Sequence, residues 1–258
     1  GNTTNVGDNT LPAGAGDVDV GGLAIGIVAG AEHTCALLDT GRVRCWGEND
    51  AGQLGYGHRN RIGDNEPPSD AGYVSIAFGS TGIAGIGAGG THTCALGANG
   101  RVKCWGAGNY GQHGYGHNAH IGNDPGEFPS TVGFVDVAGD VGVKQLSTGF
   151  DHTCAVISNG AVRCWGGSYL GQLGYGNRNS IGDTEPPSTV GDVSVDAGVI
   201  QVAAGGRHTC ALLSNGRVKC WGGNDLGQPG YGHTENVGDD AGEFPSSVGF
   251  VDLDGGVI

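Results

Sequence analysis

The chain has 258 residues, of which 56 are glycine, roughly three times the usual share of about 7%. Its formal net charge of −14 disfavours nucleic acid as a partner, because a polyphosphate backbone would be repelled. No run of about 18 apolar residues occurs, so we expect no membrane span, and any secretion signal must lie outside this sequence.

Short runs rich in Val and Ile, bounded by Gly, Asn and Asp, predict β-strands along the whole chain, and no window carries the apolar stripe of a helix. A hairpin around Cys35 and Cys45 is followed by three near-copies of itself. The first cysteines of the four copies are 59, 60 and 56 residues apart, which is the fixed period of a repeat protein. We predict one all-β repeat domain over residues 1–258, with units at about 1–56, 57–115, 116–175 and 176–231 and a terminal half-unit at 232–258.

The turn of each hairpin sets its register. In the first copy, Asp39-Thr40-Gly41 predicts a three-residue loop, a type I turn closed by a glycine in the left-handed region. Counting outward from that loop places Cys35 opposite Cys45 on a non-hydrogen-bonded pair, with Cα atoms about 4.5 Å apart, within reach of a disulfide. The register is common to all copies, so four local disulfides are predicted, namely Cys35–Cys45, Cys94–Cys104, Cys154–Cys164 and Cys210–Cys220.

A histidine two residues before each first cysteine leaves a second interpretation open. His33, His92, His152 and His208 share a strand face with those cysteines, so a Cys-Cys-His zinc site is geometrically feasible. No Cys-x-x-Cys occurs in the sequence, which favours disulfides. The histidines then have a structural role, donating to a backbone carbonyl in a turn.

After each hairpin come a Gly-Gln-x-Gly-Tyr-Gly tail, a loop rich in Asn and Asp, a proline, and two more short strands, for example at 191–195 and 199–203. Each unit therefore offers about four strands, which is the content of one blade of a β-propeller.

These motifs together resemble the regulator of chromosome condensation repeat. The residues that carry the resemblance are His33-Thr34, Gly41-Arg42-Val43 with Trp46-Gly47, and the tail at 52–55, and they recur in the three later units. The cysteine pair and the long loop resemble the secreted bacterial branch of that family. The resemblance implies an all-β propeller-type array of four-stranded blades, and the family's usual form has seven blades.

Only about four and a half repeats are present, and both ends of the sequence carry the same half-unit. Bare blades expose apolar surface and unpaired strand edges. Three explanations stay open: the chain is a fragment of a longer propeller, it forms an unusual small ring, or neighbouring subunits complete its ends. An end-to-end contact that does not close would produce a filament.

Two aromatic residues recur in every unit and are candidates for binding. One is the tryptophan that follows the second cysteine, which strand alternation places on one face with the preceding basic residue. The pair is interpreted either as a glycan or peptide site, or, as we favour, as packing between blades with the cation's stem covering the ring. The other is the tail tyrosine, expected to be exposed on one rim. The candidates are Trp46, Trp105, Trp165, Trp221, Tyr56, Tyr115, Tyr175 and Tyr231.

The acidic loops offer oxygen ligands for calcium in each unit, although Asp and Asn also serve as ordinary turn residues, which we favour. The candidate ligands are Asp64, Glu66, Asp124, Glu127, Asp183, Glu185, Asp239 and Asp240. Every catalytic candidate recurs in all units, whereas an active site usually needs one asymmetric constellation, so we expect no enzyme and no cofactor other than calcium.

The leading hypothesis is a non-enzymatic extracellular scaffold that self-assembles end to end into a filament or surface layer. The alternative is a secreted binding propeller, inhibitor-like or lectin-like, that recognises a foreign protein or glycan. The resemblance implies this alternative as well, because a secreted propeller of this type can inhibit a β-lactamase. A nuclear role in nucleotide exchange is disfavoured, since paired structural cysteines do not suit a reducing compartment.

Overall fold

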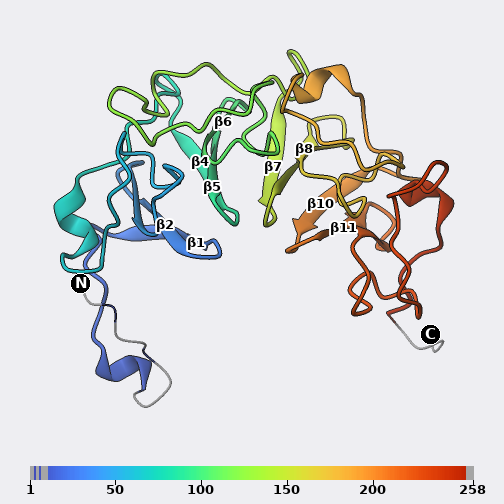
Figure 1. The fold of residues 1–258 in the computed structure, drawn as a ribbon, viewed down its shortest axis with the longest axis horizontal. Helices are drawn as coiled ribbons and strands as arrows, with labels where there is room; N and C mark the ends of the chain where they lie inside the picture. The colour runs from blue at the N-terminus through green and yellow to red at the C-terminus, as the bar shows by residue number, and fades with distance from the viewer. Residues whose placement is uncertain (1–2, 4–5, 7–10, 254–258) are drawn as a thin grey trace.

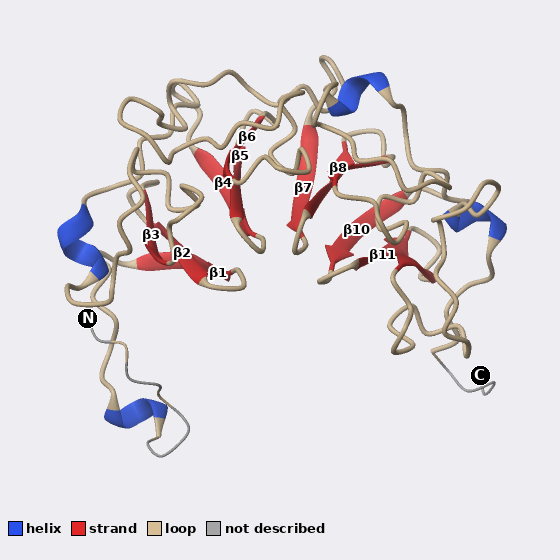
Figure 2. Ribbon diagram, in the orientation of Figure 1, coloured by secondary structure: helices blue, strands red, loops and turns tan. Residues whose placement is uncertain are grey.

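The computed structural model of the protein describes residues 3, 6 and 11–253, so the ends of the predicted 1–258 domain lie partly outside the described residues. This part of the chain forms four antiparallel sheets of three strands each, in sequential order. The strands are β1 (Ala24–Ala29), β2 (His33–Leu38), β3 (Val43–Gly47), β4 (Ile83–Ala88), β5 (His92–Gly97), β6 (Val102–Gly106), β7 (Val143–Thr148), β8 (His152–Ile157), β9 (Val162–Gly166), β10 (Val199–Ala204), β11 (His208–Leu213) and β12 (Val218–Gly222). Helix is limited to short 3₁₀ turns in the described residues, at Pro12–Gly14, Pro68–Ala71, Pro187–Thr189 and Pro245–Ser247 (Figure 2).

The four sheets follow one another around an arch, with the sheet of β1 at one end and the sheet of β11 at the other (Figure 1). The first strands contact each other in series, β1 with β4, β4 with β7 and β7 with β10. The fold is that of a propeller in which consecutive blades pack face to face, which confirms the predicted all-β, propeller-type repeat array.

The predicted hairpin register is confirmed. In the first sheet Cys35 pairs with Cys45 and Leu37 with Val43, and Gly41 closes the turn with a φ of 75°. All four predicted disulfides form, and their Cα atoms are 4.0–4.1 Å apart. Since all eight cysteines lie in disulfides, the zinc interpretation of the cysteines is wrong.

The prediction of four strands per blade is wrong, because each sheet has three. The segment expected to form a strand at 191–195 is extended but attaches to β9 by one hydrogen bond, from the Val193 N–H to the Val162 carbonyl at 2.8 Å. Val74, Val135 and Val251 make the same bond to β3, β6 and β12. A second segment forms an isolated antiparallel bridge with the last glycine of the third strand, as Ile181 does with Gly166. The outer edge of each blade is therefore covered by separate contacts and not by a continuous ladder.

Candidate functional site

The recurring tryptophans pack between blades. Trp105, Trp165 and Trp221 are completely buried, and each indole Nε1–H donates at 3.0 Å to a glutamine carbonyl in the tail of the preceding repeat. Since these three rings are inaccessible, they are not the binding residues that the sequence suggested. Trp46, in the first sheet, is only half-buried.

The glycine of each tail lets the next tryptophan approach. Gly55 has a φ of +79°, in the left-handed region, and a Cβ there would lie 2.7 Å from Trp105 Nε1. Gly114 and Gly174 hold Trp165 and Trp221 in the same way, with Cβ positions 2.8 Å from the indole nitrogen. The recurring Gly-Gln-x-Gly motif thus forms a contact site for a tryptophan.

A histidine and a threonine complete each contact between repeats. The His92 ring Nε2 lies 2.9 Å from Thr153 Oγ1, and the Thr153 hydroxyl donates to the Gln112 carbonyl at 3.1 Å. Because the hydroxyl proton is used for that carbonyl, Thr153 Oγ1 accepts from the ring, so His92 carries its proton on Nε2. The histidine partner is a threonine of the next repeat, where the sequence suggested a carbonyl in a turn.

These histidines are held in the neutral form. Burial lowers the pKa of His92 and of His152 to about 3, and that of His33 to about 4. The Nδ1 atom of each ring is buried and has no hydrogen-bond partner within the described residues, so an added proton there would lack an acceptor.

The tail tyrosines are not exposed. The Tyr56 hydroxyl lies 3.2 Å from the Cys45 N–H and 3.3 Å from the Cys45 carbonyl, on the side of β3 that faces away from β2. The hydroxyls of Tyr115, Tyr175 and Tyr231 likewise accept from the N–H of the second cysteine of their repeats. Tyr231 also donates to the Cys220 carbonyl, whereas Tyr115 and Tyr175 donate to a glycine carbonyl of the extended segment. Burial raises the pKa of Tyr175 to about 12. The tyrosine hydroxyl thus satisfies backbone groups that a fourth strand would otherwise pair.

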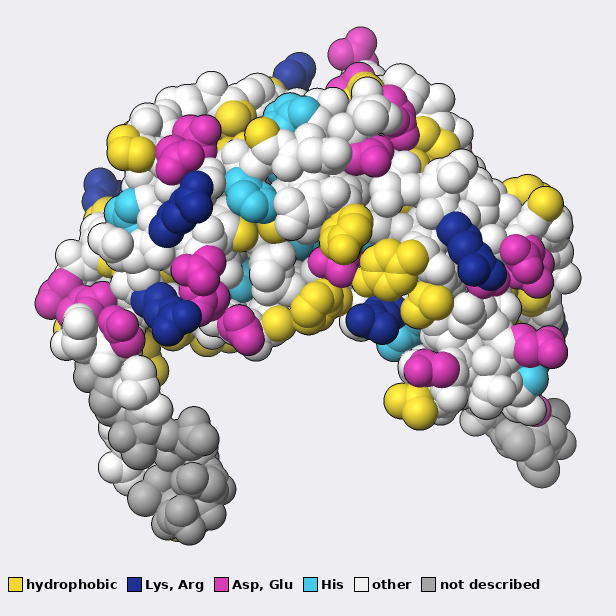
Figure 3. Space-filling model, viewed as in Figure 1, with side chains coloured by type: hydrophobic (Ala, Val, Ile, Leu, Met, Phe, Trp, Pro, Cys, Tyr) yellow, Lys and Arg dark blue, Asp and Glu magenta, His cyan; other side chains and the backbone are white. Residues whose placement is uncertain are grey.

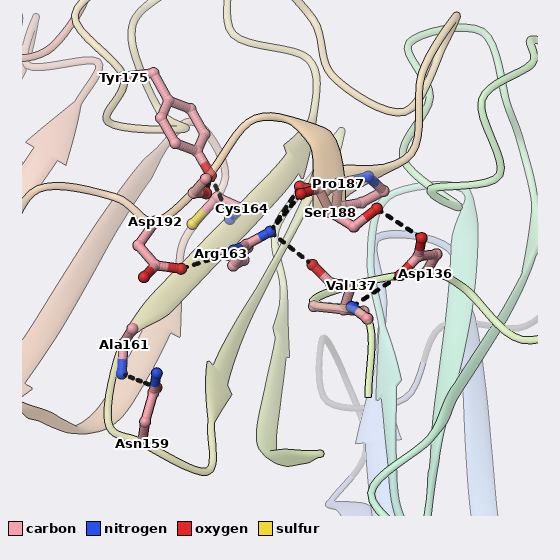
Figure 4. A network of polar contacts seen from close by, with 12 residues as sticks. Asp136, Val137, Asn159, Ala161, Arg163, Cys164, Tyr175, Pro187, Ser188 and Asp192 are labelled. Carbon is pink, nitrogen blue, oxygen red and sulfur yellow. Dashed lines mark hydrogen bonds and ion pairs between the residues drawn. The ribbon is translucent and has the colours of Figure 1, made fainter. Parts of the chain in front are cut away.

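The basic residue before each second cysteine anchors the proline-containing loop. Figure 4 shows Arg163 directed at the Pro187, Ser188 and Val137 carbonyls, with Asp192 on its other side. Nη1 donates to the Ser188 carbonyl at 2.9 Å, and Nε lies 2.8 Å from the Asp192 carboxylate. In the other repeats the cation also lies over a ring of the extended segment, as Arg44 does over Tyr73, Lys103 over Phe134 and Lys219 over Phe250. The expectation that it covers the tryptophan is therefore wrong.

Several acidic loop residues form ion pairs between neighbouring repeats. Asp124 lies 3.5 Å from Arg59, and the buried Asp239 lies 2.9 Å from Arg178. No group of three or more His, Cys, Asp or Glu able to hold a metal ion occurs among the described residues. Calcium binding at the acidic loops stays a prediction. No helix in the described part of the chain is long and apolar enough to cross a membrane.

One surface is built from residues that do not recur. Tyr110, Phe150 and Tyr169, which we call the aromatic patch, stand where the first repeat has Ala51, Ala31 and Asp50. Figure 3 shows hydrophobic side chains gathered in the middle of one face of the molecule. Tyr110 and Phe150 are 44% and 45% exposed, although both side chains are apolar over most of their surface.

Specific contacts hold the two tyrosines of the aromatic patch in place. The rings of Tyr110 and Tyr169 are 6.1 Å apart, and the Arg207 guanidinium lies 5.6 Å from the Tyr169 ring centre. The Tyr169 hydroxyl donates to Asp151 at 2.8 Å, and burial, with this carboxylate, raises the tyrosine pKa to about 12. Gly167 makes room for the ring, since a Cβ there would lie 3.1 Å from Tyr169. Motifs shared by the repeats do not indicate this surface, because its residues stand at positions where the repeats differ.

Two family models for the regulator of chromosome condensation (RCC1) repeat match the chain, one at residues 24–53, 83–112, 143–172 and 199–228 and the other at 40–96 and 159–212. The chain is 33% identical over 207 residues to the ultraviolet-B receptor UVR8 of Arabidopsis thaliana, a match that covers 80% of this chain and 43% of that protein. The chain thus spans less than half the length of this relative.

Solved structures give the same picture of the fold. Human WBSCR16 matches with a TM-score of 0.67 and 23% identity, over 91% of this chain and 54% of that one. Prp20p of Saccharomyces cerevisiae matches with a TM-score of 0.63 and 24% identity, over 91% of this chain and 51% of that one. At these identities the likeness establishes the fold.

Proposed function

Because this chain belongs to the family of RCC1 repeat proteins, we propose that it is a non-catalytic extracellular scaffold whose blades hold a binding surface for another protein. The observation that carries this proposal is that recurring and non-recurring side chains occupy different places in the structure. Recurring side chains are used in contacts within and between blades. Among the non-recurring aromatic residues, the rings of Tyr110 and Tyr169 lie 6.1 Å apart, and Tyr110 and Phe150 are exposed to solvent.

The composition of the aromatic patch suits a protein partner. Tyr, Phe and Arg are enriched at the energetically important centres of protein interfaces. Prp20p, which shares the fold, was characterised for its binding to Gsp1p and histones. A glycan is the less favoured ligand, because stacking on a sugar needs an open ring face and Arg207 already lies over one face of Tyr169.

Selection from a random peptide library on the immobilised protein tests this proposal. Enriched peptides are expected to lose binding to the Phe150→Ser variant and to keep binding to a Val190→Ser variant, whose side chain is 39% exposed outside the patch. Enrichment of peptides that bind both variants equally would contradict the proposal, and binding in a glycan array that depends on Phe150 would move the function to the lectin-like alternative.

The extracellular setting is supported by the four disulfides, one in each blade. Disulfides persist in oxidising compartments and are rare where glutathione keeps thiols reduced. On this ground we propose that the protein is secreted, as a member of the bacterial branch of the family. Mass spectrometry of protein from its native source under non-reducing conditions tests it, and free thiols in that material would exclude it.

Self-association is the second candidate function, as the structural unit of a filament or surface layer. The specific observation in its favour is that the blades at both ends of the arch expose the surfaces that inner blades bury, as Trp46 does. Light scattering over a range of concentrations tests this candidate, and a constant mass of one chain would exclude it.

A further inference from the structure

The contact between neighbouring repeats is built three times from the same five groups. The earlier repeat supplies a histidine ring, a glutamine carbonyl and a glycine in the left-handed region, and the later repeat supplies a threonine and a tryptophan. In the first of these contacts, His33 Nε2 lies 2.8 Å from Thr93 Oγ1, and the Gln53 carbonyl accepts from both Thr93 and Trp105. The second and third contacts repeat these bonds at 2.8–3.1 Å.

The first blade carries the later half of this contact without a partner. Thr34 and Trp46, which we call the head residues, are half-buried, and neither the hydroxyl nor the indole N–H has a hydrogen-bond partner within the described part of the chain. Nearby Ile27 on β1 is 68% exposed, whereas Val202, at the same position of β10, is 1% exposed. The head side of the first blade is thus an apolar surface with two polar groups available.

The last blade carries the earlier half. We call His208, Gln228 and Gly230 the tail residues. His208 is half-buried and Gln228 is exposed, whereas their counterparts His152 and Gln172 are completely buried. Gly230 has a φ of +80°, the same conformation as Gly174 at +81°, but a Cβ on it would meet only Val251, at 3.0 Å. The contact site for a tryptophan is therefore already formed at this end.

We propose that a second copy of this chain docks head to tail, resting on the self-association candidate above. Trp46 of one copy packs against Gly230 of the other, and its Nε1–H donates to the Gln228 carbonyl. Thr34 donates to the same carbonyl and accepts from His208 Nε2. The two ends are complementary to each other and not to themselves, so the contact is heterologous, and it either closes a ring of arches or extends into a fibre.

The charge of the chain adds a condition to this association. Each copy carries a net charge of −14, so two copies repel each other over distances that salt screens. Association is therefore expected to become stronger as the ionic strength rises from low to moderate values. The competing occupant of the head side is the chain's own N-terminal segment, because Thr3 lies beside the same hollow as Trp46.

Two blocking variants test the contact in the full chain. Trp46→Glu removes the half-buried head ring, and Gly230→Trp fills the tail site at a positive φ that lowers its stability somewhat. Circular dichroism is expected to show that both variants keep the sheets of the unchanged protein. Each variant alone is expected to stay at the mass of one chain, 25.8 kDa, in light scattering. An equimolar mixture keeps one intact head and one intact tail, and is expected to form a species of twice that mass. Phe150→Ser is the control and is expected to associate like the unchanged protein.

The outcomes separate this contact from self-association in general. A monomeric unchanged protein at all concentrations and salt conditions overturns both proposals. An unchanged protein that associates, with both blocking variants associating equally well, leaves self-association standing and overturns the head-to-tail contact. A mixture that stays monomeric also overturns it and assigns the head side to the N-terminal segment. Emission of Trp46 is a second readout, since burial of its half-exposed indole shifts the emission to shorter wavelength only in the associating samples.

Discussion

Acid is expected to destabilise the protein well above the pH at which its carboxylates titrate. His92 and His152 are completely buried and their folded-state pKa of about 3 lies far below the value of about 6.5 in an unfolded chain. Between these two values the unfolded chain binds protons that the folded chain does not. Stability is therefore complete above about pH 6.5 and is lost progressively as the pH falls below it.

The size of the loss follows from proton binding by the unfolded chain. Lowering the pH from about 7 to about 5 costs about 2 kcal/mol for each histidine that stays neutral in the folded state. The two fully buried rings thus account for about 4 kcal/mol, a large part of the stability of an ordinary domain. His33 and His113, whose pKa burial lowers to about 4, add to the loss in the same direction.

Urea unfolding at a series of pH values measures this loss. A His92→Gln variant, which keeps an amide N–H near Thr153 and cannot be protonated, is expected to lose about 2 kcal/mol less over the same pH range. His233→Gln, at an exposed histidine, is the control and is expected to follow the unchanged protein. A flat stability between pH 7 and pH 5, or equal pH dependence in both variants, would refute the assignment of buried neutral histidines.

Three further outcomes are expected. Gly174→Ala should destabilise the protein by about 2 kcal/mol more than Gly230→Ala in urea unfolding, because both have the same positive φ but only the first Cβ meets Trp221; equal losses would remove the tryptophan from the explanation. Tyr115→Phe should cost about 1 kcal/mol by leaving the Cys104 N–H unpaired, measured against Tyr110→Phe on the open surface. Reducing the four disulfides should lower the free energy of unfolding by up to about 2–3 kcal/mol per bond, and with it the melting temperature. An unchanged melting temperature after complete reduction would contradict this.

The hairpins could be predicted from the sequence because they are local. The loop ending at Gly41 fixes the register by itself, and Cys35 and Cys45 follow from counting a few residues outward. The fourth strand could not be predicted in the same way. The segment at 191–195 and its counterparts in the other repeats have the composition of β-strands. Whether such a segment pairs with a neighbouring strand depends on what already occupies the edge of that strand. Here the Tyr175 hydroxyl, one bond from Val193 and an isolated bridge between Gly166 and Ile181 occupy that edge.

The contacts between repeats were predicted only in outline, since they join residues about 50 positions apart. The sequence favoured packing of the tryptophans between blades over a binding site. It could not identify the partner, which for Trp165 is the backbone carbonyl of Gln112, because any residue type can supply a backbone carbonyl. The cation beside it was assigned to the wrong ring for a related reason. Alternation says which side chains share a strand face, but not which loop covers that face.

The position of the disulfides explains how the hairpins of the first and last blades stay folded. In a linear array each blade is stabilised by its neighbours. Within the described residues the first and last blades each contact one other blade, so we expect them to open before the inner blades. A disulfide between blades would leave an end hairpin free to unpair, whereas Cys35–Cys45 lies inside the first hairpin and Cys210–Cys220 inside the last. The strands that carry Trp46 and His208 therefore stay paired even while their outer sides are uncovered. A bond within each blade thus keeps both ends in the conformation that docking of a further blade requires.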